Sequence, residues 1–505
     1  MKAILSVYDK AGLEGFARGL VELGFEIYST GGTRRALESA GVEVHSVSEL
    51  TGFPEIMGGR VKTLHPGVHA GILANRAEPS HMEALAEQGL EAIDMVAVNL
   101  YPFEATVARP GVTVEEAIEN IDIGGPTMIR AAAKNHASVV VVVDPADYSA
   151  VLESLRAGEV AEPIRRRLAA GAFAHTAAYD SAIAEYTRDL EETEAWPRQY
   201  SVAGTKAQDL RYGENPHQAA ALYRRGVNRG GVAGARQLQG IELSYNNIVD
   251  VDAAWDLVQD LPAPSAAIIK HTNPSGAATG ETLADAYQRA YECDPQSAFG
   301  GIVALNQEVD EETAHRVASI FVEAVVAPGY TEAAAEVFNA KKKLRVLEIQ
   351  PAAPNIAIKV VSGGFLVQTH DAASLRRSDM RSVGVRTPTD AEWEQLLLAW
   401  KVVRHVKSNA IVLASDGAAV GVGAGQMSRV ESVQLAVQRA GDRARGSVLA
   451  SDAFFPMPDG VEAAAEAGVT AIIQPGGSIK DEGVLAVADA HGMAMIYTGR
   501  RHFRH

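Results

Sequence analysis

The chain has 505 residues, a length that predicts two to four domains instead of a single core. Hydrophobic residues make up 47% of it and charged residues 22%, which are the proportions of a soluble globular protein. The formal net charge of −17 argues against a general binder of nucleic acids or anionic membranes, so anionic substrates must be bound in local basic pockets.

Residues 2–143 alternate short apolar runs with amphipathic helical patterns, which is typical of βα units around a mostly parallel sheet. We predict strands at residues 3–7, 26–29, 95–99 and 138–143. We predict helices at residues 13–23, 34–39, 78–88, 128–134, 145–157 and 163–192. Trp196 and Pro197 then break the pattern, so we place the main domain boundary between residues 195 and 196.

Four polar loops of this first domain follow predicted strands or precede predicted helices. Their sequences are STGGT at residues 29–33, GGRVKTLHP at 58–66, NLYPF at 99–103 and DIGG at 122–125. Each is by itself an ordinary loop. Strand carboxyl ends and helix amino ends line the ligand crevice of such sheets, however, and glycines there let backbone amides hold a phosphate. Four such loops in one domain indicate a binding site.

The second part of the chain has a loop at residues 211–217, and residues 262–305 predict a strand, a loop, a helix and a strand. A similar order recurs at 410–468, with a helix at 428–440 and a strand at 447–450. We therefore predict two related α/β subdomains, although no sequence repeat is strong enough to establish them. The charged, alanine-rich residues 332–345 predict a surface helix.

Lys270 and His271 place an ammonium beside an imidazole in this second part. The apolar residues 266–269 predict a buried strand, and the Asn-Pro-Ser-Gly run at 273–276 predicts its end. Histidine can take up a proton near neutral pH, and a neighbouring ammonium can stabilise developing negative charge. Taken alone, the dipeptide is better explained as a solvated strand end, so its interpretation depends on the rest of the chain.

The polar motifs occur together in the order found in one enzyme family. In the first domain they are SVYDK, STGGT, GGRVKTLHP, NLYPF and IDIGGPTMIRAAAKNH; in the second they are LRYGENPHQ, LSYNNIVD, KHTNPSG, VKSNAIV, GAGQMSR, SDAFFP and RRHFRH. From Met1 to His505 the chain resembles the bifunctional purine-biosynthesis enzymes that join AICAR formyltransferase to IMP cyclohydrolase. The resemblance implies a methylglyoxal-synthase-like parallel-sheet domain at residues 1–195, with the cyclohydrolase activity. It implies two cytidine-deaminase-like α/β subdomains at residues 196–505, with the formyltransferase activity.

For the first domain the resemblance implies dehydrative ring closure of formyl-AICAR to IMP, in which the carboxamide nitrogen attacks the formyl carbon and water leaves. Lys134 matches the lysine at the reacting formyl group, where an ammonium can steady an oxyanion or supply a proton. Tyr101 and Asp122 match residues that orient the substrate and move protons. The positions matched around the nucleotide and its phosphate are Ser6, Lys10, Ser29, Gly31, Gly32, Thr33, Arg60, Lys62, Thr63, Asn99, Gly124 and Gly125.

For the second domain the resemblance implies formyl transfer from 10-formyltetrahydrofolate to the 5-amino group of AICAR. This amine is a poor nucleophile because its lone pair is delocalised into the imidazole ring. His271 is the expected general base, Lys270 the group that stabilises the tetrahedral intermediate, and Asn409 the amide that holds the formyl oxygen. The positions matched around AICAR or the folate are Arg211, Tyr212, Asn246, Gly301, Glu323, Arg429, Phe454, Asp459 and Arg501.

The resemblance also implies a homodimer whose formyltransferase sites form across the subunit interface. Its ligands are AICAR, formyl-AICAR and the folate, with no nucleic acid and no membrane as partner, and it leaves open whether a monovalent cation binds. The single cysteine, Cys293, excludes intrachain disulfides and favours a cytoplasmic location. No segment has the length and freedom from charge of a membrane span.

Other functions fit the chain less well. A deaminase-like fold suggests zinc-dependent base deamination, but one cysteine cannot supply the zinc ligands of that chemistry, so no zinc is expected. Residues 421–426 look like a dinucleotide loop, yet Gln426 stands where the third glycine should be, which argues against NAD. A purely ligand-sensing first domain is disfavoured because Tyr101, Asp122 and Lys134 are all present. A methylglyoxal-synthase-type lyase would release phosphate from dihydroxyacetone phosphate, which we do not expect.

Overall fold

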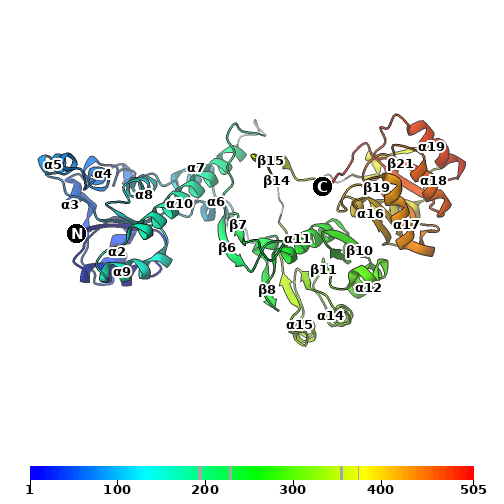
Figure 1. Ribbon diagram of the computed structural model, residues 1–505, viewed down its shortest axis with the longest axis horizontal. Helices are drawn as coiled ribbons and strands as arrows, with labels where there is room; N and C mark the ends of the chain where they lie inside the picture. Colours follow the sequence, from blue (N-terminus) through cyan, green and yellow to red (C-terminus); the bar gives the residue numbers. More distant parts are fainter. Residues whose placement is uncertain (191–195, 227–229, 353–355, 373–374) are drawn as a thin grey trace. The chain divides into compact units, whose positions relative to one another are not determined.

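The structure is a computed structural model that describes residues 1–190, 196–226, 230–352, 356–372 and 375–505. The chain forms two compact units. The first comprises Met1–Thr205, and the second takes in Lys206–Arg224 and most of the remaining chain to His505. Figure 1 labels many of the elements of both units. None of the described helices is long and apolar enough to cross a membrane.

The described part of the first unit contains a parallel sheet in the order β3-β2-β1-β4-β5. Its strands are β1 (Lys2–Val7), β2 (Glu26–Ser29), β3 (His45–Ser46), β4 (Met95–Asn99) and β5 (Val140–Val142). β4 is buried at every residue, as expected of a continuous apolar strand in the middle of a parallel sheet. The predicted strands are confirmed, the last of them with a shorter extent. β3 has only two residues, too few to leave a pattern in the sequence.

The helices of the first unit pack around this sheet. They are α1 (Leu13–Glu22), α2 (Gly31–Ser39), α3 (Val47–Thr51), α4 (Pro66–Leu73), α5 (Pro79–Glu87), α6 (Phe103–Val107), α7 (Val114–Glu119), α8 (Gly124–Lys134), α9 (Tyr148–Arg156) and α10 (Glu162–Asp189). The predicted helices are confirmed with adjusted ends. α2 and α8 begin earlier than predicted because their Gly-Gly pairs form the first helical turn instead of a preceding loop. Residues 191–192, the end of the last predicted helix, lie outside the described residues.

The second unit is built on one large mixed sheet. Its order, over the described residues, is β16 (Arg381–Val383), β21 (Ala494–Tyr497), β20 (Ala471–Gln474), β19 (Val448–Ser451), β17 (Ile411–Ser415), β18 (Ala418–Gly423), β10 (Asn273–Thr279), β9 (Ser265–Lys270), β11 (Ile302–Leu305), β12 (Ala324–Ala327), β13 (Arg345–Glu348) and β8 (Arg236–Gln239). Two separate hairpins pair β6 (Thr205–Leu210) with β7 (Ala220–Arg224) and β14 (Ile356–Val361) with β15 (Gly364–Thr369).

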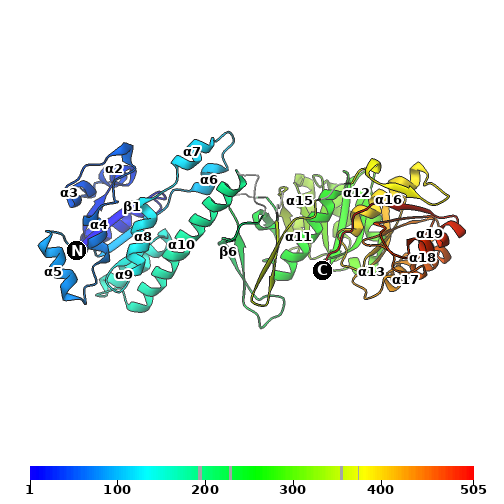
Figure 2. The same cartoon turned by 90° about the horizontal axis from the view of Figure 1, so that it is seen from above.

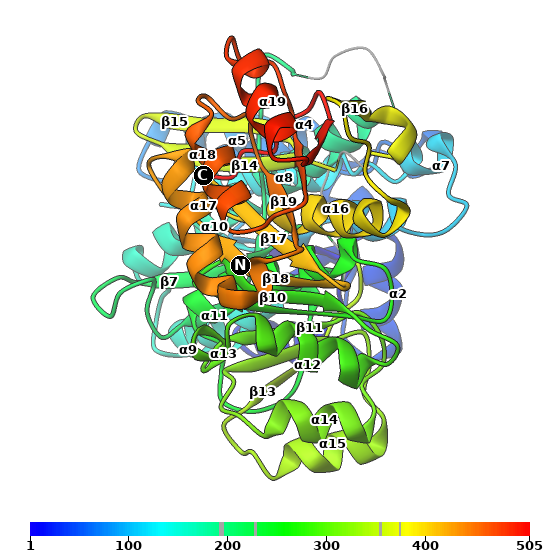
Figure 3. The ribbon, with the colours of Figure 1, turned by 90° about the vertical axis from the view of Figure 1, so that its right-hand side faces the viewer.

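Two halves of the second unit repeat one order of elements, which confirms the two predicted subdomains. The first half runs through α11 (Tyr245–Asp260), the β9-β10 hairpin, α12 (Leu283–Cys293), α13 (Pro295–Ala298), β11, α14 (Glu311–Ala318), β12, α15 (Glu332–Asn339) and β13. The second half runs through α16 (Asp390–Val403), the β17-β18 hairpin, α17 (Arg429–Ala440), β19, α18 (Asp459–Glu466), β20, α19 (Asp481–Ala490) and β21. The antiparallel contact of β10 with β18 joins the halves into one sheet (Figure 3).

Alternate residues of the central strands enter different cores. Ala267 and Ile269 of β9 pack in a core with residues of α11 and α16, whereas Ala266 and Ile268 pack with residues of α12. The helices α11 and α16 therefore cover one face of the sheet across both halves, and α12 covers the other.

Two predicted details of the second unit are wrong. Asn273 and Pro274 do not end the strand pattern, because after a two-residue turn they begin β10 and pair with Lys270 and Ile269. Residues 332–345 are not one surface helix. α15 ends at Asn339, and its Phe338 is fully buried, so the alanine-rich face packs inward.

Candidate active sites

The loops after β1, β2 and β4 meet at one edge of the first sheet, because β1 pairs with both β2 and β4. Thr33 Oγ1 donates to the carbonyl oxygen of Val7 at 2.9 Å and accepts the Val7 N–H at 3.0 Å. Asn99 Oδ1 accepts the backbone N–H groups of Tyr8 and Asp9 at 2.7 and 2.9 Å. These side chains therefore hold the three loops together.

Several residues predicted to bind the nucleotide thus have structural hydrogen bonds already. Ser29 Oγ, which is buried, donates to Leu5 O at 2.6 Å, and exposed Lys10 donates to Tyr8 O at 3.2 Å. What this edge offers an anion is the amino end of α2, where Gly31 and Gly32 lie and the first N–H groups of a helix have no intrahelical acceptor. Ser6 lies beside it near the end of β1.

Lys62 and Thr63 bring the GGRVKTLHP loop to two helix amino ends. A Cβ atom on Gly31 would lie 3.7 Å from Lys62 Nζ, and one on Gly124 would lie 2.5 Å from Thr63 Oγ1. The short distance to Thr63 favours glycine at position 124. Lys62 Nζ is also 3.4 Å from a Glu55 carboxylate oxygen. Arg60 is exposed and forms an ion pair with Glu119, with Nε–Oε1 at 3.2 Å.

Asp122 is held at the amino end of α8. Its Oδ1 accepts the Gly125 N–H at 2.8 Å. A Cβ atom at Gly125 would lie 2.6 Å from Asp122 Oδ2, so this close approach also depends on glycine. Burial raises the pKa of Asp122, while the Gly125 N–H and the charge of Lys62 act in the opposite direction. The carboxyl is therefore suited to exchanging a proton.

Tyr101 and Lys134 are more loosely placed. The Tyr101 side chain is 50% exposed, and its ring centroid lies 5.5 Å from that of Tyr8. Lys134 is exposed at the last residue of α8, about 15 Å along the helix axis from Gly124 at 1.5 Å per residue. The structure therefore groups Tyr101, Lys62 and Asp122 near one edge and leaves Lys134 at the opposite end of α8.

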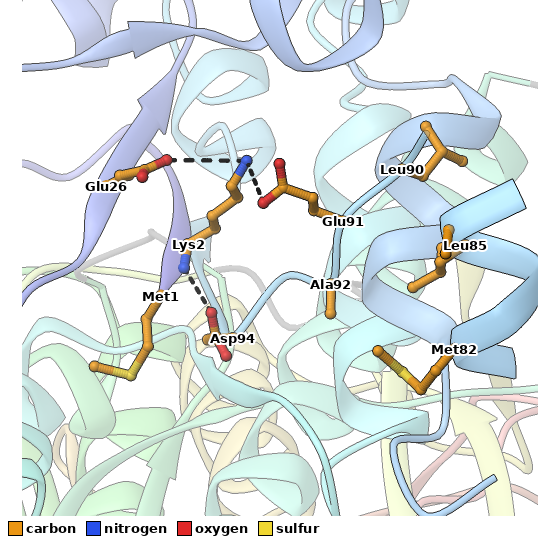
Figure 4. A pocket seen from close by; sticks show the side chains of 10 residues that line it. Met1, Lys2, Glu26, Met82, Leu85, Leu90, Glu91, Ala92 and Asp94 are labelled. Carbon is orange, nitrogen blue, oxygen red and sulfur yellow. Dashed lines mark hydrogen bonds and ion pairs between the residues drawn. The ribbon is translucent and has the colours of Figure 1, made fainter. Parts of the chain in front are cut away.

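A cavity of about 340 Å³ lies at the other edge of this unit (Figure 4). It is lined by Met1 and Lys2 at the amino end of β1 and by Leu85 of α5. Lys2 Nζ is 3.0 Å from Glu91 and 3.9 Å from Glu26. Because ligands of such sheets bind at strand carboxyl ends, this cavity is not the catalytic crevice.

In the second unit the predicted Lys-His pair lies at a strained two-residue turn. His271 and Thr272 connect β9 to β10 with φ of 54° and 64°, a left-handed conformation that is costly for a β-branched residue such as Thr272. Asp250 Oδ1 accepts the Thr272 N–H at 2.7 Å, and Asn273 Nδ2 donates to His271 O at 3.3 Å. The turn thus fixes the exposed His271 at the sheet end, where strain of this kind often marks function.

Lys270 points to the neighbouring strand connection. Its Nζ donates to Gly300 O at 2.8 Å. A Cβ atom on Gly301 would lie 2.9 Å from Ile269 O, so the close packing there requires glycine. Glu323 donates its backbone N–H to Gly301 O at 3.0 Å, and its carboxylate lies 2.7 Å from Arg345. The Glu323 side chain, predicted to bind substrate, therefore already has a cationic partner.

Asn409 has a side-chain orientation fixed by its neighbours. Its Nδ2 donates to Gln426 O at 2.9 Å and Met427 O at 3.2 Å, and its Oδ1 accepts from Arg429 Nη2 at 2.8 Å. Carbonyls only accept and a guanidinium only donates, so oxygen and nitrogen of the amide are unambiguous. In this structure both amide N–H groups are used by backbone carbonyls.

Arg429 and Asp452 form a buried ion pair behind Asn409. Their side chains are 5% and 0% exposed. Arg429 Nη1 also donates to Ala410 O at 3.0 Å, and Asp452 Oδ1 accepts the Ala410 N–H at 3.0 Å. Arg429 was predicted as a substrate contact, whereas its observed contacts hold the Asn409 loop.

The loops of this site are joined to one another. Lys407 donates its backbone N–H to Asn273 Oδ1 at 3.0 Å, which ties the Asn409 loop to the His271 turn. Asn246 Nδ2 donates to Glu214 O at 3.3 Å, which ties the RYGENPH loop to α11 one turn before Asp250. The carboxyl-terminal segment joins as well, since the His502 N–H donates to Asp452 O and the Ser408 N–H to Arg504 O, both at 2.9 Å.

The remaining predicted residues lie around this network. Phe454 is 38% exposed while Phe455 is fully buried, so Phe454 is free to stack on a flat ring and Phe455 belongs to the core. The guanidinium of Arg501 lies 4.5 Å from the Phe503 ring centroid, and that of Arg211 lies 5.7 Å from the Tyr212 ring centroid. Asp459 is exposed at the amino end of α18.

Asp250 and Asp452 are the functional candidates that the sequence did not predict in this unit. Asp452 lies in the SDAFFP motif and directly follows a buried strand, but no role was predicted for it. Asp250 ends the LSYNNIVD motif, but its role depends on the His271 turn, which the sequence placed wrongly. Over the described residues, no group of three or more His, Cys, Asp or Glu side chains is arranged to hold a metal ion.

Comparisons with known proteins bear on both units. A family model described as "AICARFT/IMPCHase bienzyme" matches residues 132–439, and one described as "MGS-like domain" matches residues 12–127. The "Bifunctional purine biosynthesis protein PurH" of Cereibacter sphaeroides is 56% identical over 100% of this chain and 98% of its own length. The protein of the same name from Anoxybacillus flavithermus is 54% identical over 100% and 99%. A solved chain described as "Crystal structure of ForH" is 40% identical over 37% of this chain and 98% of its own, with a TM-score of 0.34 that supports no structural conclusion.

Proposed function

Because this chain belongs to the AICARFT/IMPCHase bienzyme family, we propose that it uses two separate sites, one in each compact unit, for its two reactions. The chain is a bifunctional enzyme of purine biosynthesis. It transfers a formyl group to AICAR and closes the ring of formyl-AICAR to give IMP. The formyl transfer uses a folate co-substrate, which we propose to be 10-formyltetrahydrofolate.

We assign formyl transfer to the site around Lys270 and His271. His271 removes a proton from the 5-amino group as its nitrogen bonds to the formyl carbon. Lys270 stabilises the tetrahedral oxyanion and supplies a proton to the folate nitrogen as the carbon–nitrogen bond breaks. Asn409 orients the formyl group. To donate to the formyl oxygen, its amide must exchange one of its present bonds to Gln426 or Met427.

The observation that carries this assignment is the continuous set of hydrogen bonds around the turn. Asp250 and Asn273 hold the His271 turn, and Asn273 also holds Lys407, two residues from Asn409. Arg211, Tyr212 and the other matched positions then contribute phosphate, ribose and folate contacts. A guanidinium such as that of Arg211 has the fork geometry that phosphate prefers.

We assign ring closure to the edge of the first unit that carries Tyr101 and Asp122. Bonding of the carboxamide nitrogen to the formyl carbon must be matched by loss of a proton from nitrogen and protonation of the departing oxygen. Asp122 is suited to one proton transfer because burial raises its pKa. Lys134 is proposed to act at the formyl group, and Lys62 with the amino end of α2 is proposed to bind the phosphate.

One coupled assay tests the assignment. The full-length protein is supplied with AICAR and 10-formyltetrahydrofolate, and tetrahydrofolate and IMP are followed separately. We expect both products, and IMP alone when formyl-AICAR is supplied. Formation of tetrahydrofolate from AICAR and 10-formyltetrahydrofolate, with no IMP from that mixture or from formyl-AICAR, would mean that the first unit only binds ligand. Release of phosphate from dihydroxyacetone phosphate would instead favour a lyase.

We further propose a cytoplasmic homodimer. The support is the family alone, so the test is the mass in solution by sedimentation at concentrations spanning the working range. A monomer that retains full formyl transfer would refute a site shared between subunits.

A further inference from the structure

The long helix α10 contacts the loops that carry Tyr101 and Asp122. Its buried residues include Ala172, Thr176 and Tyr179, at the spacing of one helical face, and this face packs against α8 and β5. Figures 1 and 2 both show α10 running alongside α8. Two polar side chains of α10, His175 and Tyr179, lie one turn apart, and each forms a hydrogen bond to one of these loops.

Tyr179 fixes the loop before α8. Its hydroxyl accepts the backbone N–H of Asp122 at 2.7 Å and faces Asn120 O at 3.5 Å. The Asp122 carboxylate is held from the other side by the Gly125 N–H at 2.8 Å. Burial raises the pKa of Tyr179, so its hydroxyl stays protonated and can accept and donate together. The backbone and the carboxylate of Asp122 are thus set by different partners.

His175 fixes the loop after β4. Its Nε2 accepts the backbone N–H of Leu100, the residue before Tyr101, at 3.4 Å. Accepting requires the neutral imidazole. Burial lowers the pKa of His175, which favours that form, and the charge of Asp144 acts in the opposite direction. Neither residue was identified from the sequence.

We propose that His175 and Tyr179 are positioning residues for ring closure: α10 holds the Tyr101 loop and the Asp122 loop at the separation that the reaction needs. The inference rests on the proposed roles of Tyr101 and Asp122. Both contacts are made to part-buried backbone N–H groups, so losing them leaves these donors without their partner and lets the loops shift. A displacement near 1 Å at a reacting group can lower a rate roughly 10²-fold.

The chain offers a matched control on the same helix. Tyr179 and Tyr186 both pack edge-on against Phe103, with ring centroids 6.4 and 5.5 Å away. Only the Tyr179 hydroxyl has a hydrogen-bond partner among the described residues. Tyr179→Phe and Tyr186→Phe therefore remove the same atom from similar packing, and only the first removes a contact to a catalytic loop.

The test measures cyclisation of formyl-AICAR by the full-length variants. For Tyr179→Phe we expect kcat to fall roughly 10- to 100-fold with little change in KM, since the loop is misplaced and phosphate binding is not. Tyr186→Phe should match the wild type. His175→Leu should lower kcat, and His175→Gln, which keeps an acceptor, should recover most of it. Formyl transfer by the same preparations should be unchanged, which monitors folding.

The outcomes separate this inference from the proposed function. If Tyr179→Phe behaves like Tyr186→Phe, or if His175→Gln is no better than His175→Leu, the positioning role is wrong. If Asp122→Asn leaves cyclisation intact, the proposed site itself is wrong. A parallel fall in formyl transfer would make the effect of α10 a general loss of stability and would also overturn the positioning role.

Discussion

The two candidate sites differ in how firmly their residues are held. Around His271 the side chains form a connected network, from Asp250 through the turn to Asn409, with a buried ion pair behind it. In the first unit Thr33 and Asn99 hold the loops after β1, β2 and β4 together, and α10 contacts the loops that carry Tyr101 and Asp122. The side chains of Tyr101 and Lys134 are nevertheless exposed. The reactions differ in the same sense. Formyl transfer must align two separate substrates, whereas ring closure joins two groups of one molecule and needs less preorganisation by the protein.

The largest effect should come from replacing His271, the proposed general base of the site in the second unit. Replacing His271 by alanine should lower formyl transfer roughly 10²- to 10⁴-fold, the usual contribution of a general base, and leave cyclisation of formyl-AICAR unchanged. The measurement is the initial rate of each reaction in one preparation. His315→Ala, at an exposed position on α14, is the control and should change neither rate. Loss of both reactions by a folded His271→Ala protein would contradict separate sites.

The next effect concerns Lys134 and Lys62, the two lysines of the proposed ring-closure site in the first unit. Lys134→Ala should lower cyclisation about 10²- to 10³-fold if its ammonium steadies the oxyanion, and it should spare formyl transfer. Lys62→Ala should in addition shift the pH dependence of kcat. The charge of Lys62 opposes the burial that raises the pKa of Asp122, so removing it raises that pKa further.

The pH dependence distinguishes the two lysines. If Lys134 acts on the substrate directly, its variant keeps the wild-type pH profile at a lower rate, whereas the Lys62 variant moves the limb controlled by Asp122 to higher pH. An unchanged rate for Lys134→Ala would agree with its place at the far end of α8 and would remove it from the reaction.

A further effect tests the ion pair behind Asn409. Arg429→Met should lower formyl transfer about 10²-fold, because Asn409 Oδ1 loses its donor and the amide can turn. It should also cost about 3–5 kcal/mol of stability, since Asp452 is left as an unpaired buried charge. Arg439→Met removes a more exposed pair with Asp294 and should cost at most about 1 kcal/mol. Equal costs for the two variants would contradict the importance of burial.

Much of the fold was predictable because it follows from periodicity. Apolar runs located β1, β2 and β4, and helical spacing located α1 and α5. The starts of α2 and α8 were misplaced because glycine, which disfavours helices by itself, occupies their first turns. Gly31 adopts a positive φ of 51°, which favours glycine, and a Cβ atom on Gly124 would lie 2.5 Å from Thr63 Oγ1. A sequence displays neither constraint.

The candidate sites were predictable as motifs but not as contacts. The motifs pointed to His271 and Asn409, and they include Asp250 at the end of LSYNNIVD without indicating that it holds the His271 turn. They named Arg429 as a ligand contact, although its charge is balanced inside the protein by Asp452. Such pairings join residues far apart in the chain, so they depend on tertiary structure. Periodicity shows that a residue is buried, and only the fold shows what it is buried against.

The smallest predicted effect follows from the pKa of Asp122. Burial raises this pKa above that of the unfolded chain, about 3.9 for aspartate. The unfolded carboxyl therefore ionises first as pH rises, and the folded protein loses stability between the two pKa values and keeps that deficit at higher pH. Asp122→Asn, which keeps an acceptor for the Gly125 N–H, should raise the unfolding midpoint slightly at pH 8 and not at pH 3, while cyclisation is lost. Thermal unfolding of both full-length proteins at the two pH values measures this. A midpoint that falls at pH 8 would show that the ionised Asp122 carboxylate is stabilised by its surroundings. The site around Asp122 would then stabilise its charged group as well as the site around His271 stabilises its own.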